Sequence, residues 1–154
     1  MRILLTVEDE SYGEAIVDFA ANQNLSADSE LKIVHFVEPL LIGSYMSVCP
    51  SQILDEIRER KTTHATKMVE LLKTRLEKAL SSQKVSVSAD VITELPKDGI
   101  IALAQDWKAD MIVMGSHGRR GLHRIFLGSV AAAVVSHANC TVTIIRLPAL
   151  DKIV

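Results

Sequence analysis

A segment rich in glycine and basic residues, GSHGRRGLHRIFLGS, runs from Gly115 to Ser129. Glycines let main-chain N–H groups come close to an anion, and the start of a helix adds unpaired N–H donors and a positive dipole end. A helix is expected to begin where this segment ends, and Ser129 has a side chain suited to capping it. Arg119, Arg120 and Arg124 add positive charge between the glycines. These features predict a binding site for a phosphate group.

The spacing of the glycines separates this segment from two common phosphate-binding motifs. It is not a Walker A loop, because no Gly-Lys-Ser or Gly-Lys-Thr follows the first glycines. Gly115, Gly118 and Gly121 are spaced by threes, unlike the GxGxxG of dinucleotide-binding proteins. Glycines between a strand and a helix also serve simply as turn residues. The segment on its own is therefore compatible with both a turn and an anion site.

Acidic residues follow the first expected strand, at Glu8, Asp9 and Glu10. Such a cluster is either a solvated turn or a set of ligands for a Mg²⁺ that bridges phosphates. His117 and His123 flank the arginines of the glycine segment. Because no cysteine or further histidine clusters beside them, we expect them to face solvent or phosphate rather than a metal.

The other histidines and the cysteines have simpler interpretations. His35 lies within an expected strand and His64 on the apolar stripe of an expected helix, so both are interpreted as hydrogen-bonded histidines at the edge of the core. His137 ends a helix, where a cation complements the helix dipole. Cys49 and Cys140 have neither CxxC spacing nor a disulfide framework, and we expect both thiols to be free.

Hydrophobic periodicity divides the chain into alternating strands and helices. Short apolar runs predict buried strands, period-two alternation predicts a half-buried strand, and apolar stripes at spacings of three and four predict helices. Strands are expected over 2–7, 31–37, 85–91, 110–114 and 141–147, and helices around 15–20 and over 51–81, 96–107 and 128–137. This alternation favours an α/β fold with a mostly parallel sheet and helices on both faces. Such doubly wound sheets bind ligands beyond the carboxyl ends of their strands, where the winding reverses.

Length and composition limit the class of protein. The chain has 154 residues, close to the usual size of about 150 residues per domain, and 48% of its residues are hydrophobic. A net charge of -2 argues against a general binder of nucleic acid or membrane surfaces. No apolar run is long enough to span a bilayer, and the first residues do not fit a signal peptide. We therefore expect one globular, cytoplasmic domain over 1–154, without nucleic acid or membrane as a partner.

Four residues of the glycine segment fit the pattern G-x2-G-x9-G-S/T: Gly115, Gly118, Gly128 and Ser129. With the surrounding DMIVMGSHGRRGLHRIFLGSVAAAVV, they resemble the ATP-binding branch of the universal stress protein family. The resemblance covers essentially the whole chain, including a strand that ends in His-Phe-Val-Glu-Pro. Three positions depart from the family pattern. They are Glu8 in place of the usual Asp, Glu94 in place of a Gly two residues before a proline, and Thr141 in place of a proline that often opens the last strand.

The resemblance implies a five-stranded, mostly parallel sheet of order 3-2-1-4-5 sandwiched by four helices, a Rossmann-like fold similar to the adenine nucleotide alpha hydrolases. It implies that Gly115 and the acid after the first strand, Glu8 or Asp9, hold the ribose, and that the main chain at Phe36 meets the adenine. The phosphates would lie against Gly118, Gly128 and Ser129. The complete set of nucleotide-binding residues expected on this basis is Thr6, Val7, Glu8, Asp9, Phe36, Met114, Gly115, Ser116, His117, Gly118, Arg119, Arg120, Gly128, Ser129 and Val130.

The function implied by the resemblance is that of a nucleotide-dependent regulatory module of the stress response. Its ligand would be ATP, with AMP or ADP as alternatives, and Glu8 or Asp9 could act through Mg²⁺. No catalytic residue is predicted; a slow ATP hydrolase or phosphotransferase and a nucleotide-free interaction protein stay open as alternatives. An edge strand over Thr141 to Leu147 and the resemblance together predict a homodimer joined through that strand. The apolar connection 40–50 fits a lid over the base, a dimer surface or a satellite of the core.

Overall fold

The computed structural model describes residues 1–40, 51–116 and 127–147. Within these residues strands and helices alternate as the periodicity predicts. They are β1 (Arg2–Thr6), α1 (Glu10–Ala21), β2 (Ser29–Val37), α2 (Ser51–Ala79), β3 (Val85–Thr93), α3 (Pro96–Asp106), β4 (Met111–Gly115), α4 (Ser129–His137) and β5 (Thr141–Ile145). Most of the apolar connection 40–50 and residues 117–126 of the glycine segment lie outside the described residues.

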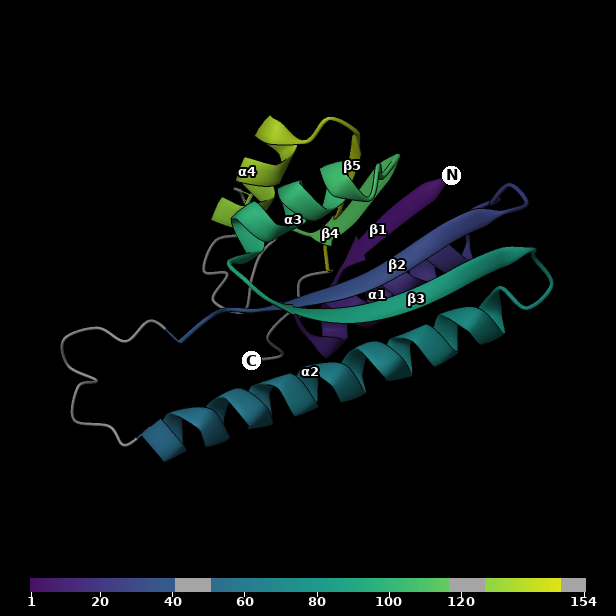
Figure 1. Ribbon diagram of the computed structural model, residues 1–154. Coiled ribbons are helices and arrows are strands. Elements are labelled where there is room, and N and C mark those ends of the chain that lie inside the picture. Colours follow the sequence, from purple (N-terminus) through teal and green to yellow (C-terminus); the bar gives the residue numbers. More distant parts are fainter. Residues whose placement is uncertain (41–50, 117–126, 148–154) are drawn as a thin grey trace, which may run out of the picture.

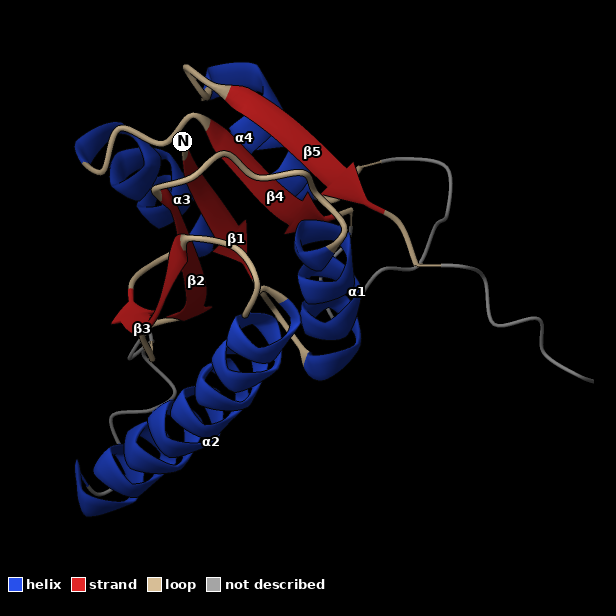
Figure 2. Cartoon of the chain, turned by 90° about the vertical axis from the view of Figure 1, so that its right-hand side faces the viewer, coloured by secondary structure: helices blue, strands red, loops and turns tan. Residues whose placement is uncertain are grey.

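The five strands form one parallel sheet in the order β3-β2-β1-β4-β5. The chain first winds outward from β1 through β2 to β3 and then crosses back to β4 on the other side of β1, as Figures 1 and 2 show. At this reversal Thr6 of β1 lies beside Met114 of β4. The predicted fold class and strand order are therefore confirmed.

Each face of the sheet packs against one pair of helices (Figure 1). Residues of β1 alternate between the two faces: Ile3 and Leu5 pack with α1 and α2, whereas Leu4 packs with α3 and α4. All three side chains are at most 2% exposed. A central strand covered on both faces requires an uninterrupted apolar run, which explains the sequence RILLT.

The edge strand β3 has a different pattern. Its residues alternate between half-buried and exposed, so that Val85, Val87 and Ala89 face the helices while Ser86 and Ser88 face solvent. The polar side chains on one face are consistent with the expected half-buried strand. In the part of the chain that the structure describes, no helix is long and apolar enough to cross a membrane.

Helix α2 corrects one prediction. Its first turns lie beyond the end of β3 (Figure 1), and of residues 51–64 only Leu54 is buried. His64 is therefore exposed rather than at the edge of the core, and Leu71, seven residues later on the same flank of the helix, is 70% exposed. Consecutive residues of a helix point about 100° apart. Ala65 and Leu72 consequently face the core, whereas His64 and Leu71 lie on the flank.

Candidate functional site

The predicted site residues that the structure describes gather at the carboxyl ends of β1, β2 and β4 and at the start of α4. We call this region the switch edge, and define it as residues 6–9, 36–37, 114–116 and 128–130. Thr6 and Met114 form its floor, since they are paired neighbours and are 7% and 5% exposed. The turns that follow β1 and β4 therefore start from adjacent strands, as expected at a topological switch point.

Glu8 and Asp9, two of the three acidic residues after β1, have different surroundings. Asp9 is the N-cap of α1, and its Oδ1 accepts a hydrogen bond of 2.9 Å from the main-chain N–H of Tyr12. Its carbonyl also accepts from the N–H of Gly13 at 2.8 Å. Glu8 is exposed at the end of the strand. One carboxylate oxygen of Asp9 is thus committed to starting the helix, and Glu8 is the more exposed of the two acids.

Phe36 is the last residue but one of β2. The N–H of Val7 donates to the carbonyl of Val34 at 2.9 Å, so the main chain of Val34 faces β1. Successive strand residues direct their main-chain groups to alternate sides of the strand. Phe36 is two residues after Val34, so its main-chain groups also face the β1 side, at a point beyond Thr6, where β1 has ended. The side chain of Phe36 is buried against α3 and contacts Gly99. The main chain of Phe36 is the part of this residue that can reach a ligand.

The prediction for His35 is confirmed. Its ring lies on the α1–α2 face of the sheet, 7% of the residue is exposed, and Nδ1 lies 2.9 Å from the carbonyl oxygen of Val7. This hydrogen bond joins the ends of β1 and β2 at the point where their ladder stops. His35 therefore has a structural role on the α1–α2 face of the sheet, next to the switch edge.

Ser116 connects the end of β4 to three other elements. Its N–H donates to the carbonyl of Ile145 in β5 at 2.9 Å, and its carbonyl accepts from the N–H of Gly128 at 2.8 Å. Its hydroxyl lies 3.2 Å from the hydroxyl of Tyr12 in α1. Only 2% of Ser116 is exposed. A residue at the centre of the predicted site is thus bonded to β5, to the start of α4 and to α1.

Tyr12 was missed by the sequence analysis. Its ring packs against Gly115, where an added Cβ would lie only 2.7 Å from Cδ1 of Tyr12. Gly115 is therefore required at this position because of a neighbouring side chain, whatever its role toward a ligand. One signal was available: Tyr12 precedes Ile16 and Ala20 by four and eight residues, which places it on the buried face of α1.

The start of α4 corrects a second prediction. Gly128 is the N-cap, without a side-chain capping bond, and Ser129 is the first helical residue, so Ser129 does not cap the helix. Ser129 is exposed and Val130 is half-buried. The first N–H groups of any helix have no partner within it, and those of α4 lie directly beside the end of β4. This part of the site offers main-chain donors to an anion.

Several predicted residues lie outside the described residues, so the structure does not test their placement. They are His117, Gly118, Arg119 and Arg120. Among the residues that are described, no group of three or more His, Cys, Asp or Glu side chains is arranged to hold a metal ion.

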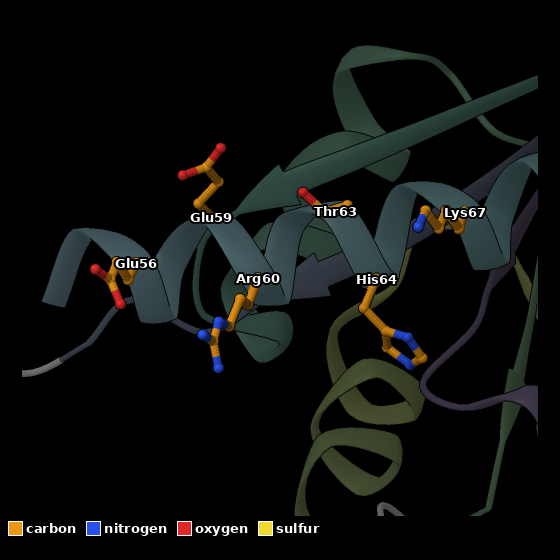
Figure 3. Close-up of a pocket in the computed structure, with 6 residues that line it drawn as sticks. All are labelled: Glu56, Glu59, Arg60, Thr63, His64 and Lys67. Atoms are coloured by element: carbon orange, nitrogen blue, oxygen red, sulfur yellow. The ribbon is translucent and has the colours of Figure 1, made fainter. Parts of the chain in front are cut away.

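Two surface pockets lie along α2, and of the predicted residues only Asp9 lines either of them. Figure 3 shows the first, which is lined by Glu56, Glu59, Arg60, Thr63, His64 and Lys67. All six come from one helix, and Arg60 and His64 point to the opposite side from Glu59, so they do not converge on a ligand. The second pocket lies between the acidic turn and α2 and is lined by Asp9, Glu10, Ser11, His64 and Met68. It borders the switch edge on the α2 side.

One titratable group of the described chain has a clearly shifted pKa. Partial burial, with a smaller contribution from the nearby Asp110 carboxylate, raises the pKa of the Cys140 thiol. This thiol is half-buried directly before β5, and the shift disfavours its thiolate. The expectation of a free thiol is confirmed for Cys140.

A parallel sheet of order 3-2-1-4-5, with main-chain donors gathered at its switch point, defines a Rossmann-like α/β protein. The chain belongs to the universal stress protein family, whose model matches residues 1–146. Universal stress protein MJ0531 of Methanocaldococcus jannaschii is 38% identical over 86 residues, which is 51% of this chain and 51% of that protein. The aligned region thus spans about half the length of that relative.

Solved structures agree with this family assignment. The structure of MJ0577 from Methanocaldococcus jannaschii superposes with a TM-score of 0.78 at 25% identity and covers 96% of both chains. A family member from Arabidopsis thaliana, solved with AMP bound, superposes with a TM-score of 0.61 at 19% identity, covering 97% of this chain and 93% of that one. The second comparison shows the shared fold.

Proposed function

We propose that the chain is an ATP-binding universal stress protein, a nucleotide-dependent regulatory module of the stress response that acts as one cytoplasmic domain over 1–154. The observation that carries the proposal is the convergence of three features at the switch edge. The acidic turn after β1, the outward main chain of Phe36 and the start of α4 all lie at the carboxyl ends of adjacent strands. The AMP-bound relative from Arabidopsis thaliana supports an adenine nucleotide as the ligand.

Each part of the nucleotide would have its own partners. The N–H and carbonyl of Phe36 would bind the adenine edge, because they face past the end of β1. The carboxylate of Glu8 would accept hydrogen bonds from the ribose hydroxyls. The main-chain N–H groups at Ser129 and Val130 would bind phosphate, where the helix dipole favours negative charge. His117, Gly118, Arg119 and Arg120 would complete the phosphate end.

A Mg²⁺ ion bound with ATP would depend on few protein ligands. This ion is usually held by one or two carboxylates together with phosphate oxygens. Glu8 at the end of β1 is exposed, whereas Asp9 is half-buried. The more accessible Glu8 carboxylate would therefore contact the ion, which would neutralise phosphate charge.

Isothermal titration of the purified protein with ATP, AMP and adenosine tests the proposal. We expect ATP and AMP to bind, and Glu8→Gln to weaken both, because an amide is a poorer acceptor for ribose hydroxyls than a carboxylate. Thr66→Val is a matched control, since the Thr66 hydroxyl bonds only within α2 in the described structure. No binding of ATP or AMP at millimolar concentration would refute the proposal, provided that the purified protein also releases no nucleotide, measured as absorbance at 260 nm after denaturation.

We also propose that β5 joins two copies into a homodimer. β5 lies at the edge of the sheet (Figure 2). The N–H of Thr141 donates to the carbonyl of Asp110, and the carbonyl of Ile145 accepts from the N–H of Ser116, so both face β4. The main-chain groups of Val142 and Ile144 alternate with these and therefore point outward from the sheet. An edge strand with half-buried apolar residues favours pairing with a second strand. The paired segment would extend over Thr141 to Leu147.

A proline substitution tests the dimer at one outward main-chain group. Val142→Pro removes an outward N–H and leaves the bonds to β4 in place, and proline is tolerated on edge strands in this orientation. Val142→Thr keeps the N–H and serves as the control. Analytical ultracentrifugation should show a dimer for the wild type and Val142→Thr at micromolar concentration, and a monomer for Val142→Pro. A wild-type monomer under these conditions would exclude the dimer.

A further inference from the structure

Tyr12 contacts two consecutive residues at the end of β4. Its ring fills the space beside Gly115, where an added Cβ would lie 2.7 Å from Cδ1 and 2.9 Å from Cε1. Its hydroxyl lies 3.2 Å from Oγ of Ser116. A single side chain from α1 thus sets both the packing and the hydrogen bonding of the turn that follows β4.

The contacts of Tyr12 continue to the start of α4. Ser116 accepts a main-chain hydrogen bond of 2.8 Å from Gly128, the N-cap of α4. The N–H of Ser116 is bonded to Ile145 at 2.9 Å, so the residue has little freedom to move without disturbing β5. The hydroxyl of Tyr12 therefore contacts the side chain of the same residue, Ser116, whose carbonyl positions the N-terminus of α4.

The main chain of Tyr12 is tied to the opposite part of the switch edge. Its N–H donates to Oδ1 of Asp9 at 2.9 Å, next to Glu8. Tyr12 is consequently bonded through its main chain to the acidic turn and through its side chain to the turn after β4. The sequence of contacts is Asp9, Tyr12, Ser116 and Gly128.

We propose that Tyr12 is a positioning residue that holds the start of α4 in register with the acidic turn, and thereby determines how strongly the protein prefers adenosine phosphates over adenosine. This inference rests on the proposed nucleotide site and identifies the residue that connects its two ends. Hydrogen bonds between main-chain N–H groups and phosphate weaken steeply when their distance or angle changes. A small displacement of the α4 N-terminus therefore weakens phosphate binding and leaves the contacts of the nucleoside unchanged.

The test uses Tyr12→Phe, which keeps the ring against Gly115 and deletes only the hydroxyl. Loss of one hydrogen bond predicts that affinity for ATP and AMP falls about threefold to tenfold, while affinity for adenosine, titrated to millimolar concentration, is unchanged. Thr74→Val deletes a hydroxyl that bonds to Glu70 within α2, far from this turn, and should change neither affinity. Ser116→Ala removes the same hydrogen bond from the other side, and should lower phosphate-dependent affinity even if Tyr12→Phe fails to fold.

A double-mutant cycle completes the test. If Tyr12 acts through Ser116, Tyr12→Phe should have no further effect on ATP affinity in a Ser116→Ala background. Additive losses would overturn the positioning role, as would equal losses for ATP and adenosine or an unchanged ATP affinity in Tyr12→Phe. In each of these cases the wild type still binds nucleotide and the proposed function stands. Absence of binding in the wild type would instead overturn both.

Discussion

The main-chain N–H of Gly128 donates to the carbonyl of Ser116 at 2.8 Å, and this bond fixes the start of α4 beside the end of β4. The two residues are twelve apart in the sequence, and the segment between them contains Gly118, the second glycine of the pattern. Gly128 has φ -59° and ψ 157°, an extended conformation that any residue can adopt. The fold does not require glycine there for its backbone angles.

Gly128→Ala consequently separates a binding role from a structural one. We expect a melting temperature close to that of the wild type, because the backbone angles suit alanine. Affinity for ATP should fall about tenfold or more, since a methyl group displaces phosphate from the neighbouring N–H groups and charge-assisted hydrogen bonds are lost. Thermal unfolding and titration on the same sample check both expectations. Unchanged ATP affinity would show that the phosphate does not approach Gly128.

Glu8 and Asp9, two of the acidic residues after β1, should respond differently to substitution. Asp9→Ala removes the N-cap of α1 and should cost about 1 kcal/mol of the free energy of unfolding. Asp9→Asn should restore most of this stability, because asparagine caps equally well. Glu8→Ala should weaken ATP binding, because it removes the proposed acceptor of the ribose hydroxyls. Urea denaturation and titration distinguish the residues, and full ATP affinity in Glu8→Ala or unchanged stability in Asp9→Ala would contradict the assignment.

Gly115→Ala should destabilise the protein by about 1–3 kcal/mol, the usual cost of overpacking, because its Cβ would lie 2.7 Å from Cδ1 of Tyr12. The added methyl forces the Tyr12 ring out of its position. In a Tyr12→Ala background the same substitution should cost much less, because the ring is no longer there. Urea denaturation of the four proteins measures this coupling, and additive effects would show that the ring is not the source of the clash.

The raised pKa of Cys140 predicts slow alkylation. Burial and the Asp110 carboxylate disfavour the thiolate, so at pH 8 the folded protein should react more slowly than an ordinary thiol with a pKa of about 8.5. Unfolding returns the pKa to its ordinary value, so this thiol stabilises the fold fully below that value, and its contribution declines as pH rises through the raised pKa. Iodoacetamide rates of the Cys49→Ser protein as a function of pH, with and without urea, report Cys140 alone. A midpoint at or below the unfolded value would contradict the shift.

The order of the elements was predictable because each depends on local spacing of apolar residues. The run RILLT indicates a strand buried on two faces, and the alternation at Val85, Val87 and Ala89 indicates a half-covered one. The placement of β1 beside β4 followed from the resemblance, which implies the strand order 3-2-1-4-5. This order agrees with the structure.

The exposure of His64 was not predictable from spacing. A stripe spaced by threes and fours spans more than one flank of a 29-residue helix, and the sequence does not indicate where the sheet beneath it ends. The role of Tyr12 was hidden for another reason. Its partner Ser116 is 104 residues away, and a polar pair between distant elements leaves no periodic signal.

The strand order also has a consequence for the order of folding. β1 is complete after the first few residues, but its neighbour β4 begins at Met111, so the chain must close a long loop before the two strands can pair. The β1–α1–β2–α2–β3 half can assemble earlier from closer neighbours. During synthesis the part of the switch edge where β1 and β4 lie side by side therefore forms only after more than two-thirds of the chain has emerged. A truncated chain that ends before β4 would lack it entirely.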